Sequence, residues 1–332
     1  MEPAADQVAS TLGSDVEPGT DRVPVTVLAG FLGSGKTTLL NRILEGGHRL
    51  RVAVFVNDFG SIDVDSRLIA HRDANVIALD NGCICCTIGA DLVSQLTALV
   101  EGPSRPEHVL VECSGVSDPG RLLVSLRDSY LQRFARVDGV VTVVDSAAFD
   151  EIPPAALELA RRQLASADVI VLNKVDLVSR ERLARVRGRI MYPAARLVEA
   201  TYAEIPLEVA LGVGGCNAHP TRAAHDHGAA FATWAWTTSE PLAYRAARKA
   251  LASLPASVFR AKGFLYLAEV PEQRVVAHVV GRRVDVRPLG PWNGAEPRTE
   301  LVFVSLDPDV DQERVRVLLT NATASELASS SS

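Results

Sequence analysis

The stretch Val23–Thr38 reads VPVTVLAGFLGSGKTT, and it decides the fold of the first part of the chain. Its beginning, Val23–Ala29, is apolar and rich in β-branched residues, which is typical of a buried strand. Gly30–Thr38 then matches the phosphate-binding loop G-x-x-x-x-G-K-[ST]. The residues after it have apolar side chains at helical spacing, and Gly46-Gly47 ends the predicted helix. A chance glycine-rich turn would not bring a strand, this loop and a helix together in the order that the motif requires.

The loop predicts how a nucleoside triphosphate would be held. Its glycines let successive backbone N–H groups point at phosphate oxygens, and the helix N-terminus adds partial positive charge. Lys36 is expected to reach the β- and γ-phosphates, and the Thr37 hydroxyl is expected to bind Mg²⁺. The expected nucleotide-binding residues of the loop are Gly30, Gly33, Ser34, Gly35, Lys36, Thr37 and Thr38.

Composition limits the class of protein. The chain has 332 residues, enough for two domains, with 47% hydrophobic and 22% charged residues. Its net charge of −6 argues against nucleic-acid binding. No apolar stretch approaches the ~20 residues that cross a bilayer, so no membrane association is expected. The acidic start lacks the apolar core of a signal peptide. Five cysteines, three of them within residues 83–86, do not form a disulfide framework, so we expect a reducing, cytoplasmic location.

The order of predicted elements gives the fold class. Short aliphatic runs alternate with helical stretches, which predicts an α/β P-loop GTPase domain with a mostly parallel sheet covered on both faces. These runs lie at 52–56, 76–79, 109–111, 140–144 and 169–172. Later strand-like runs at 231–238, 258–267, 275–286 and 301–306, with helical stretches at 242–254 and 312–319, predict a smaller C-terminal α+β domain.

These patterns also set the expected domain boundaries. The GTPase domain is predicted at 23–211, a histidine-bearing linker at 212–228 and the C-terminal domain at 229–322. The remaining segments, 1–22 and 323–332, are polar and are expected to be disordered tails.

Asn173-Lys174-Val175-Asp176 follows a predicted strand and indicates which base is bound. The Asp176 carboxylate can accept two hydrogen bonds, from the ring N–H and the exocyclic amine of guanine. Adenine offers no such pair, and sites of this kind can discriminate by about 10⁴-fold or more. Asn173 and Lys174 would brace the phosphate loop and cover the base. N-K-x-D alone also fits a polar strand-to-helix turn, but downstream of a phosphate loop it favours GTP over ATP.

Glu112 ends an aliphatic run and precedes Cys113-Ser114-Gly115. A carboxylate there can hold Mg²⁺ or its waters, and the Gly115 N–H can sense the γ-phosphate. The alternative is a solvated strand end. Given the phosphate loop upstream, we expect Lys36, Thr37 and Glu112 to act in catalysis, and Thr37 and Glu112 to hold magnesium.

A cysteine cluster is the second decisive feature. Asn81–Thr87 reads NGCICCT, and three thiols this close are poor packing material and cannot easily pair with one another. Thiolates are soft ligands that suit Zn²⁺ or Cu⁺, and Co²⁺ can follow zinc into such sites. Three ligands leave an open coordination position, which suits a metal held for transfer. The alternative is a set of unliganded or redox-active cysteines. The expected metal ligands are Cys83, Cys85 and Cys86.

Histidines in the predicted linker give a weaker signal. His219, His225 and His227 could capture a metal transiently, and a plain polar loop explains them equally well. Outside the cluster, Cys113 follows a strand and is expected in the core, and Cys216 fits either a structural or a ligand role.

Taken together, these motifs resemble the CobW family of P-loop GTPases, metallochaperones related to cobalamin-synthesis protein W. The matching segments are Gly30–Thr38, Asn57–Gly60 with Asp65, Gly82–Cys86, Glu112–Gly115, Asn173–Asp176 and Arg260–Gly263. The resemblance spans about residues 23 to 320. Two positions depart from the family pattern, since Asp58 and Ser61 stand where the family commonly has Glu.

The resemblance implies GTP hydrolysis coupled to delivery of a transition metal, commonly zinc or cobalt, to a client protein. The implied cofactors are GTP, Mg²⁺ and Zn²⁺ or Co²⁺. The C-terminal domain is expected to recognise the client. Whether the chain forms a nucleotide-dependent homodimer is left open. One rival is a regulatory GTPase whose cysteines are redox-active or inert. A second is a metal-binding module with a vestigial nucleotide site, against which the intact Lys36, Thr37 and Asp176 argue.

Overall fold

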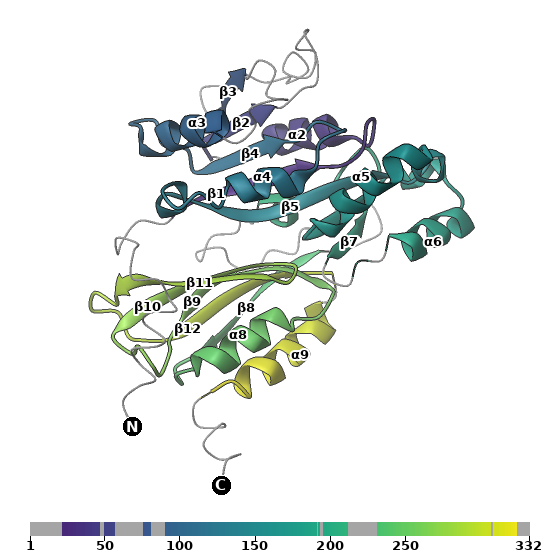
Figure 1. Ribbon diagram of the computed structural model, residues 1–332. Coiled ribbons are helices and arrows are strands. Elements are labelled where there is room, and N and C mark those ends of the chain that lie inside the picture. The colour runs from purple at the N-terminus through teal and green to yellow at the C-terminus, as the bar shows by residue number, and fades with distance from the viewer. Residues whose placement is uncertain are drawn as a thin grey trace. The chain divides into compact units, whose positions relative to one another are not determined.

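The computed structural model of the chain describes residues 22–46, 50–56, 76–80, 90–190, 192, 195–211, 231–306 and 308–323. They fall into two compact units, divided between residues 211 and 212, and Figure 1 labels the elements of both. No helix within these ranges is long and apolar enough to cross a bilayer.

The first unit is built on a parallel sheet. Its described strands are β1 (Val23–Ala29), β2 (Val52–Val56), β3 (Val76–Asp80), β4 (His108–Glu112), β5 (Ala135–Asp145), β6 (Val169–Asn173) and β7 (Arg196–Glu199). Their order across the sheet is β3-β2-β4-β1-β5-β6-β7, and all neighbouring pairs run parallel. The expected α/β class with a mostly parallel sheet is confirmed.

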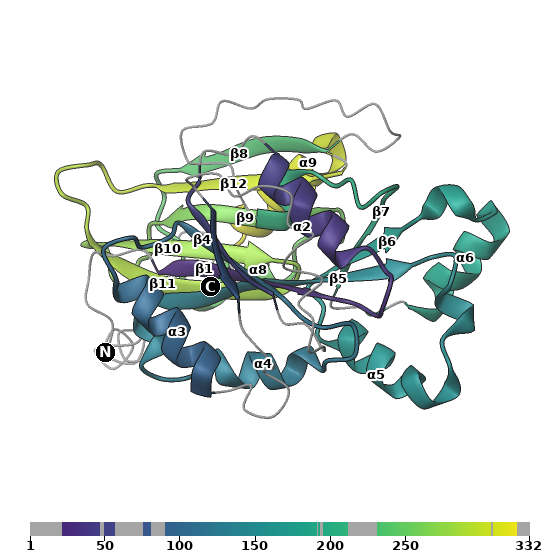
Figure 2. The ribbon, with the colours of Figure 1, turned by 90° about the horizontal axis from the view of Figure 1, so that it is seen from above.

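Helices cover both faces of this sheet. α3, α4 and α5 lie on one side and α2 lies on the other (Figure 2). On the first side, Val25 and Val27 of β1 share a buried cluster with Leu96 of α3 and Leu122 of α4. Burial on both faces explains why the strands read as continuous aliphatic runs. The described helices of the unit are α2 (Lys36–Glu45), α3 (Ala90–Glu101), α4 (Pro119–Ser125), α5 (Pro154–Ala165), α6 (Arg180–Arg189) and α7 (Leu207–Leu211).

The position of β1 determines where a ligand can bind. β1 lies between β4 and β5, so the phosphate loop that follows it emerges where both neighbours also end. Open parallel sheets bind ligands in the crevice at the carboxyl ends of such strands.

Four elements of this unit have no clear sequence signal: α4, α6, β7 and α7. α4 and α7 span less than two and a half turns, and β7 is a short strand. α6 reads RERLARVRGR and buries Val186 alone among its residues, so it has almost no apolar stripe. Side-chain caps begin α4 and α6: Asp118 accepts a hydrogen bond from Gly120 N–H, and Ser179 accepts one from Arg182 N–H.

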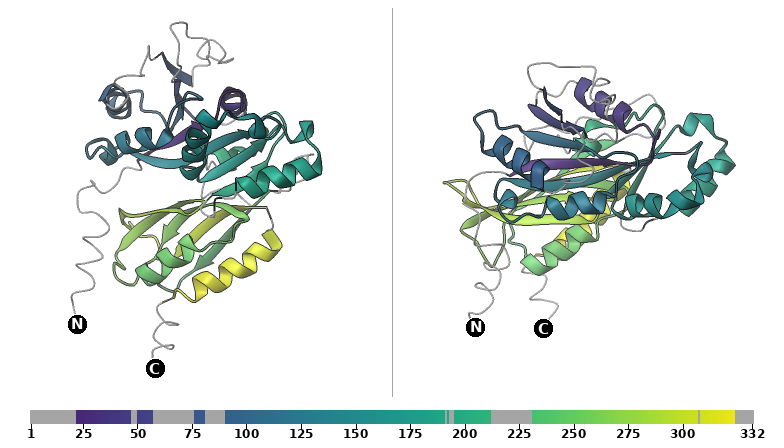
Figure 3. Two further views of the ribbon diagram at one scale, coloured as in Figure 1. Left: turned by 45° about the vertical axis from the view of Figure 1, so that its right-hand side comes forward. Right: turned by 45° about the horizontal axis from the view of Figure 1, so that its top comes forward.

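The second unit pairs an antiparallel sheet with two helices. Its described strands are β8 (Ala232–Thr238), β9 (Val258–Leu265), β10 (Gln273–Val280), β11 (Arg283–Pro291) and β12 (Thr299–Ser305), in the order β11-β10-β9-β12-β8. α8 (Tyr244–Ala252) and α9 (Pro308–Thr320) lie together on one face of this sheet, as the two views of Figure 3 also show. Leu251 and Leu319 from the helices share a core with Leu301 and Phe303. The expected α+β class of this unit is confirmed.

One predicted strand is wrong in this unit. The run 275–286 reads as a single strand, whereas the structure divides it between β10 and β11. Val280 pairs with Arg283, so only Gly281 and Arg282 connect the two strands. Gly281 has a φ of 59°, a conformation that glycine adopts without steric cost. The glycine inside the apolar run therefore marks a tight hairpin turn rather than a strand interior.

The segment Arg260–Gly263 has a clear structural reason for its glycine. β9 and β12 pair there, with Gly263 opposite Leu301. A Cβ atom on Gly263 would lie 1.8 Å from the carbonyl oxygen of Glu300. The close approach of β12 therefore requires glycine at this position.

Candidate nucleotide-binding site

The phosphate loop, residues 30–38, passes so close to its neighbours that two positions accept only glycine. A Cβ atom on Gly30 would lie 2.2 Å from the carbonyl oxygen of Val143 in β5. A Cβ atom on Gly35 would lie 2.4 Å from Nδ2 of Asn173 at the end of β6. Both glycines have positive φ angles, 136° and 107°. The motif glycines are therefore fixed by the ends of β5 and β6 as well as by the turn itself.

The N-terminus of α2 opens onto a pocket. No described side chain caps this helix at Gly35, and its first turn has no acidic residue. The first N–H groups of a helix lack partners within it, and with the helix dipole they form a site for anions. A pocket of about 610 Å³ lies there, lined by residues of 32–38 together with Glu112 and Ser114–Val116. Its size and lining suit the phosphate groups of a nucleotide.

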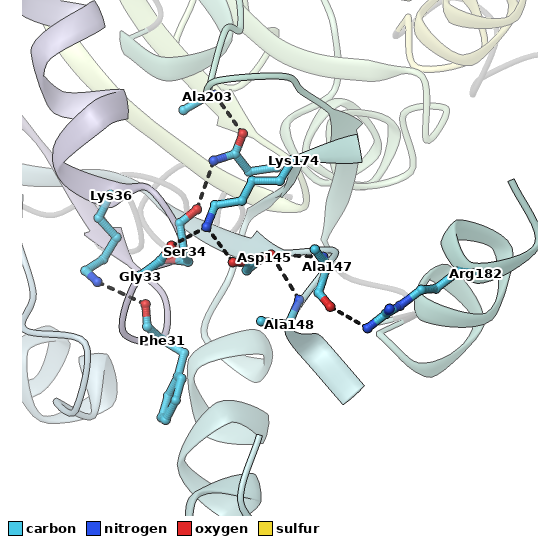
Figure 4. Close-up of polar contacts among 11 residues, drawn as sticks. Phe31, Gly33, Ser34, Lys36, Asp145, Ala147, Ala148, Lys174, Arg182 and Ala203 are labelled. Carbon is cyan, nitrogen blue, oxygen red and sulfur yellow. Dashed lines mark hydrogen bonds and ion pairs between the residues drawn. The ribbon is translucent and has the colours of Figure 1, made fainter. Parts of the chain in front are cut away.

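Lys36 lies against the backbone of the loop. Its side chain is mostly buried, and Nζ donates a hydrogen bond to the carbonyl oxygen of Phe31 at 3.2 Å (Figure 4). The ammonium group is thus held beside the N-terminus of α2, and both features place positive charge on the same pocket.

Thr37 and Glu112 meet across this pocket. Thr37 Oγ1 donates a hydrogen bond to Glu112 Oε1 at 2.8 Å, joining the first turn of α2 to the end of β4. Glu112 is buried because β4 is flanked by β1 and β2, with Leu28 and Val56 beside it. A hydroxyl and a carboxylate are hard oxygen donors of the kind that Mg²⁺ takes in phosphate sites. The donor set therefore fits magnesium.

Asn173 ties together the two ends of the site. Its Nδ2 donates to the carbonyl oxygen of Ser34 at 2.9 Å, and its Oδ1 accepts from Ala203 N–H at 2.7 Å. One buried amide thus links the phosphate loop to the loop after β7. Asp176 lies in the short 3-10 helix Val175–Leu177 and is exposed.

Lys174 makes a second connection to the phosphate loop. It has a φ of 60°, and its Nζ donates to the carbonyl oxygen of Gly33 at 2.9 Å and pairs with Asp145 Oδ2 at 2.6 Å (Figure 4). Asp145 also accepts hydrogen bonds from the N–H groups of Ala147 and Ala148. Sequence reasoning missed Asp145. Its signal was an acidic residue directly after the buried run 140–144.

The loop after β7 was also missed. Tyr202 and Ala203 have φ angles of 50° and 56°, values that are uncommon for residues with side chains. Arg42 of α2 holds this loop, since its Nε donates to the Tyr202 carbonyl oxygen at 2.6 Å and its guanidinium pairs with Glu204 at 3.6 Å. No local pattern indicates this loop, because its place depends on the pairing of β7 with β6.

Cys113 lies in the core of the first unit. It is buried among the side chains that α3 and α4 present to the sheet. Burial raises the pKa of the Cys113 thiol to about 12, although the nearby charge of Lys36 acts in the opposite direction. The thiol is therefore protonated at neutral pH and is a poor metal ligand.

The predicted transition-metal residues lie outside the described residues. This holds for Cys83, Cys85 and Cys86, for His219, His225 and His227, and for the segment 57–65. Within the ranges that the structure describes, no group of three or more His, Cys, Asp or Glu side chains is arranged to hold a metal ion. The cysteine cluster thus stays a prediction from sequence.

Two protein families match the chain. The family described as CobW/HypB/UreG, nucleotide-binding domain, matches residues 24–196. The family described as cobalamin synthesis protein cobW C-terminal domain matches residues 231–323. One match covers most of the parallel-sheet unit, and the other covers the described part of the second unit.

Individual relatives extend over both units. "Zinc chaperone CobW" of Sinorhizobium sp is 32% identical, over 90% of this chain and 97% of that protein. "Zinc-regulated GTPase metalloprotein activator 1" of Dictyostelium discoideum is 29% identical, over 87% of this chain and 72% of that protein. Among solved structures, the Zn(II)-bound YjiA GTPase from E. coli is 22% identical, covers 91% of this chain and 99% of its own, and has a TM-score of 0.44.

Proposed function

Because the chain belongs to the CobW family of P-loop GTPases, we propose that its GTP hydrolysis controls the loading of a transition metal and its delivery to a client protein. The chain would be a metallochaperone whose cargo is Zn²⁺, or alternatively Co²⁺. The relatives named as zinc chaperones support zinc as the first choice.

One observation carries the nucleotide half of the proposal. Thr37 and Glu112 come from segments far apart in the sequence, yet they meet at 2.8 Å at the pocket beside the N-terminus of α2. When Mg²⁺ is bound, Thr37 and Glu112 would hold it, and the ion would neutralise phosphate charge. Lys36 would bind the β- and γ-phosphates, and the Gly115 N–H would contact the γ-phosphate.

The base would lie at the other end of the site. Asn173 and Lys174 hydrogen-bond the carbonyl oxygens of Ser34 and Gly33, so they fix the phosphate loop relative to the base loop. Asp176 is exposed next to them and would accept hydrogen bonds from the guanine edge. This arrangement would select GTP because adenine leaves the carboxylate without its partners.

The cargo would bind to the cysteine loop. Cys83, Cys85 and Cys86 offer soft thiolates at the spacing of a compact three-ligand site, with one position left for exchange. We propose that GTP and Mg²⁺ favour the conformation that binds metal tightly, and that hydrolysis releases it. His219, His225 and His227 are proposed only as transient ligands.

We also propose a role for each part of the chain. Residues 23–211 would form the GTPase domain, 212–228 the linker and 229–322 the domain that recognises the client. Two copies of the chain would also associate as a homodimer, depending on the bound nucleotide.

A metal competition titration tests the proposal. The chain is titrated with Zn²⁺ or Co²⁺ against a chromogenic chelator, once with a non-hydrolysable GTP analogue and Mg²⁺ and once with GDP. We expect tighter metal binding with the GTP analogue, because GTP is proposed to favour the conformation that binds metal. Linkage then requires the metal to raise GTP affinity by the same factor. We also expect binding to weaken as the pH falls, because thiolates must lose their protons to bind metal.

Two cysteine variants complete the test. Cys85→Ala with Cys86→Ala should abolish tight binding, whereas the control Cys113→Ala, at a buried thiol that is a poor metal ligand, should leave it unchanged. Equal metal affinities in the two nucleotide states, or wild-type affinity in the double variant, would overturn the metallochaperone proposal. Either result would favour a regulatory GTPase whose cysteines are redox-active or inert.

A further inference from the structure

Gln163 is a polar side chain buried in the first unit. It lies near the end of α5, between Arg162 and Leu164, and is only 2% exposed. Glutamine is mostly found at protein surfaces. A buried amide is costly unless its donors are satisfied, so the contacts of this side chain need a reason.

The Gln163 amide group is directed at the loop that follows β4. Its Nε2 donates to the carbonyl oxygens of Gly115 and Ser117, both at 3.1 Å. A carboxamide has two N–H donors, and both are used here. The opposite amide orientation would place the side-chain oxygen against two carbonyl oxygens, so the contacts fix the orientation. Gln163 therefore holds two carbonyl groups of one short loop.

The same loop is held from its other side by the phosphate loop. A Cβ atom on Gly115 would lie 2.7 Å from the backbone nitrogen of Leu32 and equally near its side chain. Gly115 thus lies between Leu32 and Gln163. Its N–H is the group proposed above to contact the γ-phosphate, and it shares a peptide plane with the Ser114 carbonyl, which accepts a hydrogen bond from Ser117 N–H at 2.9 Å. Holding the carbonyl groups of Gly115 and Ser117 therefore restrains the peptide units on either side of this one.

The helix that carries Gln163, α5, is itself hydrogen-bonded to the sheet. The Thr142 hydroxyl in β5 donates to the backbone carbonyl oxygen of Gln163 at 3.1 Å, and both residues are buried. Arg162 pairs with Asp118, the N-cap of α4, at 3.5 Å, although this arginine is largely exposed and adds little. The helix is thus anchored to the sheet independently of the Gln163 side chain.

We infer that Gln163 is a positioning residue that holds the Ser114–Ser117 loop so that Gly115 can distinguish GTP from GDP. This inference rests on the proposed GTPase function and adds a residue on α5 to it. Gln163 acts through the loop and does not touch the nucleotide. Its loss should therefore weaken recognition of the γ-phosphate, while binding of the α- and β-phosphates by the phosphate loop stays intact.

Gln163→Leu tests the inference, because leucine fills similar space without donating hydrogen bonds. The affinities for GDP and for a non-hydrolysable GTP analogue, the kcat of GTP hydrolysis and the Tm are measured on the full chain. We expect the GTP analogue to bind about tenfold more weakly and kcat to fall by about tenfold, with GDP affinity within about twofold of wild type. Gln163→Met, which is unbranched like glutamine, should give the same ratio if the leucine variant folds poorly.

Thr142→Val is the matched control. It removes the hydrogen bond from the Thr142 hydroxyl to the backbone carbonyl oxygen of Gln163 and should lower Tm. The ratio of GTP to GDP affinity should stay at the wild-type value. An unchanged ratio and kcat in both Gln163 variants, or the same change in Thr142→Val, would overturn the inference. A wild-type chain that does not hydrolyse GTP would instead contradict the proposed function itself.

Discussion

The phosphate loop and the proposed base end of the candidate nucleotide site are built in different ways. At the phosphate loop, the Gly30 backbone lies against the backbone of β5, and a single added carbon on Gly30 would collide with the Val143 carbonyl oxygen. At the base end, side chains make the connections: the Asn173 amide joins Ser34 to Ala203, and Asp176 is exposed. A backbone contact leaves no room for an added atom, whereas side-chain contacts can be weakened one at a time. Changes at the phosphate end should therefore have larger effects.

The largest effect is expected for Gly30→Ala. Its Cβ would lie 2.2 Å from the Val143 carbonyl oxygen at a φ of 136°, so both overpacking and backbone strain oppose it. We expect a loss of about 3 kcal/mol or more in the free energy of unfolding, with loss of nucleotide binding. Urea unfolding and nucleotide titration measure both.

Gly33→Ala is the control for this collision. Gly33 also has a positive φ, 70°, but an added Cβ would meet no described atom within 4 Å. Only backbone strain of about 1–2 kcal/mol should remain. If the two alanine variants lost equal stability, close approach to β5 would not be what requires glycine at position 30.

Lys36→Ala should remove catalysis and leave the fold in place. The lysine lines the pocket, where its charge would act on phosphate rather than pack an apolar core, so stability should change little. Loss of a cation at the transferred phosphate should lower kcat by at least about 10²–10³-fold. Steady-state hydrolysis and circular dichroism measure the two effects, with Lys249→Ala on α8 as a lysine control. Wild-type turnover in Lys36→Ala would remove this loop from the active site.

At the base end, Asp176→Asn should change specificity rather than abolish activity. The new amide cannot accept both guanine hydrogen bonds, so GTP affinity should fall by about 100-fold. Xanthosine triphosphate should gain affinity, because its C2 carbonyl can accept from the amide. Competition between the two nucleotides measures both changes on one protein. Unchanged GTP affinity with no gain for the xanthine nucleotide would place the base elsewhere.

The same contrast explains what the sequence could predict. The phosphate end is local, since strand, loop and helix follow one another from Val23 to Glu45, and their sequence patterns agree. Glu112 was predicted because it ends an aliphatic run, although its meeting with Thr37 depends on β4 pairing with β1. Local patterns therefore indicated the residues where motif and strand end coincide, and their roles stay predictions.

The remaining parts of the site depend on the strand order, which no local pattern contains. Asp145 reaches Lys174 because β5 and β6 are neighbours, and Ala203 reaches Asn173 because β7 lies beside β6. Gln163 reads in the sequence as a polar residue on an amphipathic helix. It is buried only because the loop after β4 lies against α5.

The smallest effect should come from Arg42→Gln, which loosens the base loop without touching the base. Arg42 donates to the Tyr202 carbonyl oxygen and pairs with Glu204, but its side chain is 39% exposed. The change should cost about 0.5–1 kcal/mol of stability and weaken GTP and GDP about equally, by about twofold. Arg316→Gln, which breaks an exposed pair with Glu313 on α9, is the control and should leave nucleotide affinity unaltered. A selective loss of GTP over GDP in Arg42→Gln would show that the base loop also senses the γ-phosphate, and the two ends of the site would then not be separable.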